Sequence, residues 1–220
     1  MKKYLLFGII LFVSNIVFAQ NDINKYPEPE FSNEVYYLKK DNSFFVVRLE
    51  KNSSKIESKA KLGGFGGSES ALPIEGEKST TRLNLLNKLS FVFSNGTTAK
   101  KSNSLQDSMM AANGMDASMM QDMMGGMNDP ANTITLYKLE ISNGKRKILL
   151  QKNPGAITFG SKKQKSSDKY TFSVKKIRNG YWELVIDKTL TRGEYAFTYA
   201  GMGMGGSADG SINIFAFAVE

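Results

Sequence analysis

Residues 170–187 read Tyr-Thr-Phe-Ser-Val-Lys-Lys-Ile-Arg-Asn-Gly-Tyr-Trp-Glu-Leu-Val-Ile-Asp, and this stretch decides the fold. Two runs of alternating apolar and polar residues flank Asn179-Gly180, the pattern of two antiparallel strands joined by a tight turn. The apolar residues of each run share one face: Tyr170, Phe172 and Val174 on the first, and Trp182, Leu184 and Ile186 on the second. The stretch therefore predicts a half-buried β-hairpin.

The register of this hairpin follows from the buried face. A two-residue loop would set apolar residues of one strand opposite polar residues of the other. A three-residue loop over 178–180 instead sets Val174 opposite Leu184 and Lys175 opposite Glu183. We therefore predict that loop, with Gly180 left-handed beside a bulge.

The same alternation recurs along most of the chain and predicts an all-β fold, an antiparallel β-sandwich in a single domain over residues 20–220. The other predicted strands are Glu34–Leu38, Phe44–Leu49, Lys88–Phe93, Thr133–Ile141, Lys147–Leu150, Glu194–Ala200 and Ser211–Val219. Residues 52–77 lack the alternation and are predicted as a loop or frayed strand. Their glycines 63–67 lack the lysine and helix of a phosphate-binding loop.

The first nineteen residues have the pattern of a secretory signal peptide. Lys2 and Lys3 precede an apolar run over 5–13, and Val17-Phe18-Ala19 suits a signal peptidase. We expect cleavage after Ala19 and export to the periplasm or exterior of a Gram-negative cell. No later stretch has the roughly 18–20 apolar residues of a membrane helix.

The chain contains neither cysteine nor histidine, which removes most nucleophilic, zinc and acid–base chemistry. Paired carboxylates remain possible catalysts, and Glu183 and Asp187 are the best candidates because they share one face of their strand. We interpret Glu183 as half of a cross-strand ion pair with Lys175 on a solvated face. The sequence therefore predicts no enzyme, and it implies no cofactor.

Positive charge is concentrated between Lys138 and Lys176, where eleven lysines and arginines face only Glu140 and Asp168. Such a surface can meet lipopolysaccharide or an acidic polysaccharide. Alternatively, the lysines keep exposed strand edges soluble and unpaired. We predict no nucleic-acid partner, because an exported protein rarely meets nucleic acid and the lysines form no known motif.

The sequence from Trp182 onward resembles that of a known group of proteins. Gly193-Glu194-Tyr195-Ala196-Phe197, a glycine-containing loop and Phe215-Ala216-Phe217 follow in an order similar to uncharacterised exported β-rich proteins of Bacteroidetes-type bacteria. It covers about the last fifty residues well and the rest loosely. The resemblance implies a β-sandwich, with Tyr195 and Phe197 in one core face, and no catalytic residues.

Apart from the signal, methionine occurs in only two segments, an insertion at about 99–130 and the loop 201–206. Ser104 with Asp107 predicts a helix start, and Gly125-Gly126 with Asp129-Pro130 predicts its stop. On such a helix the methionines form one apolar stripe. The predicted contact surface consists of Met115, Met119, Met120, Met123, Met124 and Met127, together with Met202 and Met204.

Three interpretations of this methionine surface remain open. The insertion is a crossover helix or poorly ordered cover for the sandwich, or a contact for another envelope protein or a membrane surface. Alternatively, Met119, Met123 and Met127 bind Cu(I) or Ag(I) through their thioethers. The sequence thus predicts an exported, non-catalytic binding or scaffolding protein, with periplasmic Cu(I) or Ag(I) binding as the alternative.

Deletion of residues 105–127 tests the methionine surface. We expect the shortened protein to keep its far-ultraviolet circular dichroism and cooperative unfolding, because the β pattern lies outside the deletion. Capture of the partner in affinity purification from the native cell should be lost. Unfolding of the shortened protein would show instead that the methionines belong to the core.

Overall fold

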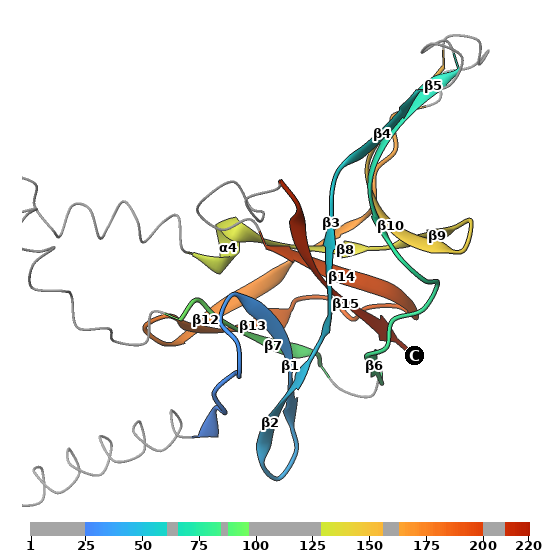
Figure 1. Ribbon diagram of the computed structural model, residues 1–220. Coiled ribbons are helices and arrows are strands. Elements are labelled where there is room, and N and C mark those ends of the chain that lie inside the picture. Colours follow the sequence, from blue (N-terminus) through green and yellow to red (C-terminus); the bar gives the residue numbers. More distant parts are fainter. Residues whose placement is uncertain (1–24, 61–65, 85–87, 97–128, 156–162, 200–209) are drawn as a thin grey trace, which may run out of the picture.

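The computed structural model describes residues 25–60, 66–84, 88–96, 129–155, 163–199 and 210–220. Three β-sheets make up this part of the chain and pack in a sandwich-like arrangement (Figure 1). Their pairings are antiparallel apart from the short parallel contact of β6 with β15. The predicted antiparallel β fold is therefore confirmed.

Sheet A has the order β12-β13-β7-β1-β2. In that order its strands are Phe172–Arg178, Tyr181–Ile186, Ser90–Ser94, Glu34–Lys40 and Phe44–Arg48. The first two form the predicted hairpin, with Val174 opposite Leu184 and Lys175 opposite Glu183. At the tip Gly180 is left-handed as predicted, with φ of 71°, but the loop length and the position of the bulge differ from the prediction. Arg178 still pairs with Tyr181, so the loop is Asn179-Gly180, and the bulge lies between Lys176 and Arg178.

Sheet B has the order β11-β8-β14-β15-β3, with β6 beside the end of β15. Its strands are Lys169–Tyr170, Ile134–Lys138, Gly193–Tyr199, Ile212–Val219, Glu50–Ser54 and, for β6, Arg82–Leu83. Large and small residues alternate along its central strands, as in Phe215-Ala216-Phe217. Both faces are buried, because the aromatic face packs on one neighbouring sheet and the alanine face on the other.

Sheet C has the order β4-β5-β10-β9, with the strands Glu57–Ala60, Gly67–Ile74, Lys145–Pro154 and Glu140–Ser142. In Figure 1 the far ends of β4 and β5 project away from the other two sheets. Residues 52–77, predicted as a loop or frayed strand, thus supply two strands of this sheet and the end of β3. The prediction failed because the projecting strands are polar on both faces and show no hydrophobic period.

Two apolar clusters join the sheets. The larger cluster lies between sheets A and B and contains Phe91, Phe197 and Phe217, whose rings meet at centroid distances of 4.9–5.8 Å. The smaller lies between sheets B and C, where Ala196 and Ala216 allow close approach. Fully burying one large apolar side chain contributes about 1.5–3 kcal/mol, so the larger cluster dominates stability.

An interruption of the strand at Leu139 corrects a second prediction. The single strand predicted over Thr133–Ile141 is divided into β8, in sheet B, and β9, in sheet C. Leu139 itself is 6% exposed and packs in the smaller cluster. One run of alternating residues therefore serves two sheets.

The methionine-rich insertion lies largely outside the described residues, as do the loop 201–206 and the signal peptide. At its end, Asp129-Pro130 begins a helix where a helix stop was predicted. Asp129 caps α4 (Pro130–Thr133) by accepting a hydrogen bond from the Ala131 amide, and proline suits the first turn. Within the described residues, no helix is long and apolar enough to cross a membrane.

Arg146 of β10 joins sheets B and C and is 1% exposed. Its Nη2 donates to Glu50 Oε1 of β3 at 2.6 Å, and its Nη1 lies 3.6 Å from Glu194 Oε2 of β14. Further donors bind the carbonyl oxygens of Glu75 and Gly76 at 2.9 and 3.1 Å. Every part of the guanidinium is thus engaged, which a buried charge requires.

Replacing Arg146 by methionine should lower the free energy of unfolding by about 3–5 kcal/mol, because the buried Glu194 and the partly buried Glu50 lose their cation. Urea unfolding measures the loss. The combined variant Arg146→Met/Glu50→Gln/Glu194→Gln should recover part of it. Arg82→Met is the control, since that side chain is 39% exposed and its ion pairs contribute little. Equal losses for the two arginines would contradict the prediction.

Candidate functional site

Glu183, a candidate from sequence, lies in a buried ionic cluster on the outer face of sheet A. The residue is 1% exposed. Tyr26 donates its hydroxyl to Oε2 at 2.8 Å, and Lys40 forms an ion pair with Oε1. The prediction of a solvated pair with Lys175 was therefore wrong. Lys175 does lie opposite in register, but residues 25–31 and Lys40 cover the carboxylate, which no local pattern indicates.

The N-terminal residues 25–31, here called the strap, are held against sheet A at several points. Besides the Tyr26 contact, Tyr181 donates to the Pro27 carbonyl oxygen at 2.6 Å, and Glu28 pairs with Arg178. Phe31 lies under the Arg48 guanidinium at 4.4 Å from the ring centroid. Burial raises the pKa of Tyr181 to about 12, so its hydroxyl stays a donor at neutral pH.

The Glu183 cluster does not have the properties of an acid–base centre. Burial by itself would raise the pKa of Glu183, but hydrogen bonds from Lys40, Tyr26 and Ser90 outweigh it and hold the pKa below 4.5. A general acid or base works best with a pKa near the working pH. Asp187 is exposed and accepts from Ser173 Oγ at 2.6 Å, away from this cluster. The two carboxylates therefore do not act as a pair.

A second buried carboxylate, Glu34, repeats the pattern. It accepts from Arg48 at 2.9 and 3.0 Å and from Lys51 at 2.9 Å. Burial again opposes ionisation, and the two cations again hold the pKa of Glu34 low. Both clusters are structural ion pairs at the sheet surfaces.

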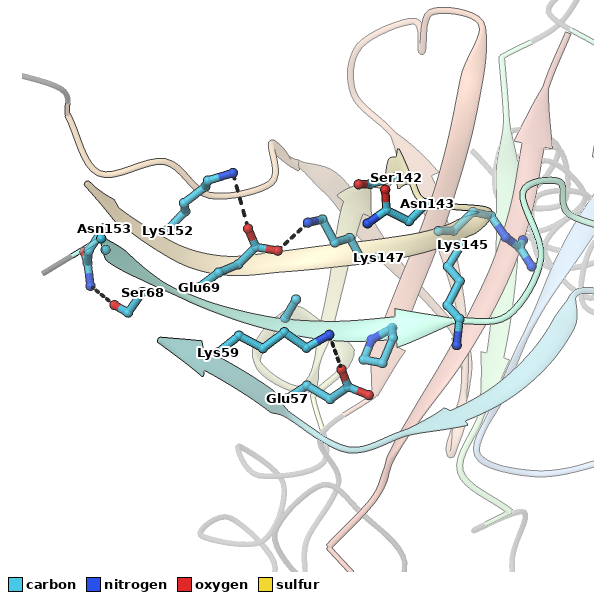
Figure 2. Close-up of a pocket in the computed structure, with 15 residues that line it drawn as sticks. Glu57, Lys59, Ser68, Glu69, Ser142, Asn143, Lys145, Lys147, Lys152 and Asn153 are labelled. Carbon is cyan, nitrogen blue, oxygen red and sulfur yellow. Dashed lines mark hydrogen bonds and ion pairs between the residues drawn. The ribbon is translucent and has the colours of Figure 1, made fainter. Parts of the chain in front are cut away.

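A groove of about 540 Å³ lies over one face of sheet C (Figure 2). Because side chains alternate along strands, Glu57 and Lys59 of β4, Glu69 of β5, and Lys147 of β10 share this face. The bulge between Leu149 and Gln151 resets the alternation of β10, and it brings Lys152 to the same face. The opposite face of the inner part packs on sheet B.

Charges in the groove are partly paired. Glu69 lies between Lys147, its hydrogen-bond partner, and Lys152, whose Nζ is 3.3 Å from Oε2 (Figure 2). The Lys147 hydrogen bond holds the pKa of Glu69 below its ordinary value. Lys59 lies 3.2 Å from Glu57, with both side chains more than half exposed. Lys145, at the rim, pairs with Glu75 at 2.6 Å.

The lining residues carry an excess of positive charge. Four lysines line the groove, at positions 59, 145, 147 and 152, against the lining carboxylates Glu57 and Glu69 and the rim carboxylate Glu75 that pairs with Lys145. Arg146 also lines it, but its guanidinium is neutralised by Glu50 on the other side of the sheet. Among the described lining residues there is no aromatic ring on which a sugar could stack. The groove therefore suits a ligand with anionic groups.

Sequence reasoning missed this groove, because residues 52–77 were not assigned to strands. The sequence feature that could have revealed these strands is the spacing of charged residues rather than hydrophobic alternation. Glu57 with Lys59, and Lys145 with Lys147, are spaced by two, the period of a strand face.

The predicted methionine sites could not be placed. Met115, Met119, Met120, Met123, Met124, Met127, Met202 and Met204 all lie outside the described residues. Among the described residues, no group of three or more aspartate or glutamate residues could hold a metal ion. No protein-family model, curated protein or solved structure matches the chain.

Glu183→Gln tests the ionic cluster through its pH dependence. Because the folded pKa lies below 4.5, ionised Glu183 stabilises the fold above about pH 4.5, and this contribution is lost as pH falls through the folded pKa. The variant should lose about 1.5–3 kcal/mol at neutral pH, and the difference from the native protein should shrink in acid. Urea unfolding across pH measures it.

The control is Asp41→Asn, which removes an exposed carboxylate paired with Lys39 at 2.9 Å. It should change the free energy of unfolding little at any pH. A Glu183→Gln loss that does not vary between neutral and acid pH would contradict the ionic role.

Proposed function

We propose that this chain is an exported, non-catalytic binding protein of the bacterial envelope that holds an anionic ligand in the lysine-lined groove of sheet C. The observation that carries the proposal is the excess of four lysines over three carboxylates, Glu57 and Glu69 in the groove and Glu75 at its rim, on one exposed sheet. Long-range attraction between an anionic ligand and a surface with a net positive charge raises the association rate and weakens with salt.

The state of the carboxylates supports a non-catalytic role. The pKa values of Glu34, Glu50, Glu69 and Glu183 all lie below 4.5, because cations bind each carboxylate. At Glu34, Glu50 and Glu183 these bonds outweigh burial, which acts in the opposite direction. Carboxylates held in this way remain ionised at neutral pH and cannot deliver a proton as a general acid.

The structure divides the basic segment 138–176 noted in the sequence. Arg146 is buried, Lys165 pairs with Glu140 at 2.7 Å, and Lys169 lies over the Tyr137 ring at 5.6 Å. Lys145, Lys147 and Lys152 line the groove and are joined there by Lys59 from a distant part of the sequence. The ligand chemistry that fits is a polymer bearing carboxylate or phosphate groups, such as an acidic envelope polysaccharide.

Partner contact through the methionines and export of the chain remain proposals based on the sequence alone. Neither conflicts with the groove, since sheet C contains no methionine among its described residues. The copper alternative at Met119, Met123 and Met127 also remains a prediction.

Substitution of the two rim lysines tests the groove. Lys59→Gln and Lys145→Gln should each weaken binding of polygalacturonate about two- to fivefold, the range expected for one exposed ion pair. Calorimetric titration at low and physiological salt measures it, and salt should weaken binding further. Lys39→Gln, on sheet A, is the matched control and should bind as the native protein does.

Two results would contradict the proposal. One is polygalacturonate binding that the control variant weakens as much as the rim variants do. The other is no binding of polygalacturonate or polyphosphate at low salt. Tighter binding of single-stranded DNA than of either polymer would redirect the assignment to nucleic acid.

A further inference from the structure

The strand β4 is an open edge of sheet C. Among the described strands it pairs only with β5, and its four residues are all exposed. An edge strand presents unpaired N–H and C=O groups at every second residue, which can pair with another strand. The projecting position of β4 in Figure 1 leaves this edge clear of sheets A and B.

The sequence of β4 is complementary to itself when two copies run antiparallel. If Ser58 lies opposite the partner's Ser58, then Glu57 lies opposite the partner's Lys59, and Lys59 opposite the partner's Glu57. Opposite charges in directly opposed positions stabilise a strand pair by about 0.2–1 kcal/mol each. The symmetry of a two-fold axis produces both ion pairs at once.

Neighbouring registers do not share this property. Keeping the lysine-lined faces of both copies on one side allows only shifts by an even number of residues. One such shift sets Glu57 against the partner's Glu57, and the other sets Lys59 against the partner's Lys59. Like charges in opposed positions are destabilising. The Ser58 register is therefore selected by charge.

The other face of β4 is complementary as well. Ile56, directly before the strand, is 55% exposed and is among the few large apolar residues that are exposed in the described part of the chain. In the Ser58 register it lies opposite the partner's Ala60. Pairing would thus remove apolar surface from water on one face, while forming two ion pairs on the other.

We propose that two copies of this chain associate edge to edge through β4, antiparallel about Ser58, and join their two sheets C into one. The lysine-lined grooves then lie on the same face of a continuous sheet and can hold one polymer bivalently. The pairing does not depend on the proposed ligand. Because the interface is short, the dimer forms weakly and depends on concentration.

Charge reversal tests the register. Glu57→Lys and Lys59→Glu each place like charges in opposition, and each should weaken the dimer roughly tenfold in sedimentation equilibrium. A mixture of the two variants should form a heterodimer, because every opposed pair is then of opposite sign. The double variant Glu57→Lys/Lys59→Glu should dimerise like the native chain.

The matched control is Asp41→Lys, since Asp41 and Lys39 form an exposed pair with the same spacing on the β1–β2 hairpin. This variant should leave the dimer unchanged. If the mixture shows no more heterodimer than either single variant shows homodimer, the proposed register is wrong.

A disulfide trap detects the dimer even where it is weak. The chain contains no cysteine, so Ser58→Cys adds the only thiol. Directly opposed residues of antiparallel strands have Cα atoms about 4.5–5.5 Å apart, which suits a disulfide. Mild oxidation should give a covalent dimer, and adding Glu57→Lys should reduce its yield.

Ser173→Cys is the control for random collision, because Ser173 is exposed on β12, the edge strand of sheet A. No greater covalent dimer from Ser58→Cys than from Ser173→Cys would overturn the proposal. Polygalacturonate binding by the Asp41→Lys and Glu57→Lys variants separates the two hypotheses. If Glu57→Lys loses the dimer but still binds polygalacturonate, the result supports the pairing without testing the groove. If both variants lose polygalacturonate binding, the result counts against the groove and leaves the pairing unaffected.

Discussion

The arrangement of the sheets depends on one buried cation, Arg146. The apolar cluster between sheets A and B is large and aromatic, whereas the cluster between sheets B and C is small and aliphatic. Apolar contact alone is non-directional and would leave sheet C free to choose among orientations. The guanidinium binds Glu50 and lies close to Glu194 and two carbonyl oxygens, which only one placement of β10 satisfies. The ion network therefore orients the layer that carries the groove.

Separate ion pairs hold other carboxylates of the sheets in place. Glu34 and Glu183 bind cations from other strands of sheet A, and Glu50 of sheet B binds Arg146 of sheet C. A buried carboxylate costs free energy unless it is paired in this way. On the groove face of sheet C, four lysines stand against Glu57, Glu69 and the rim carboxylate Glu75.

Chain order places the open edge beside the groove. The stretch 44–60 passes through all three sheets in turn, as β2, β3 and β4, and β4 is the last strand on its side of sheet C among the described residues. The residues of β4 are mostly polar, so this strand does not join a hydrophobic core, and their alternation places Glu57 and Lys59 on the groove face. Ligand groove and pairing edge are therefore two consequences of one polar strand.

The sequence by itself determined the strands with hydrophobic alternation, the antiparallel β class and the register of 170–187, because this alternation specifies which residues share a face. It did not determine what covers each face. Glu183 and Lys175 were correctly placed opposite each other, yet the strap and Lys40 bury that carboxylate, and Arg146 was taken for part of a basic surface. The strands of 52–77 and their lysine-lined groove also required the tertiary structure. Which residues share a strand face is a local property of the backbone, whereas burial and pairing depend on segments that lie 78 to 157 residues apart in these contacts.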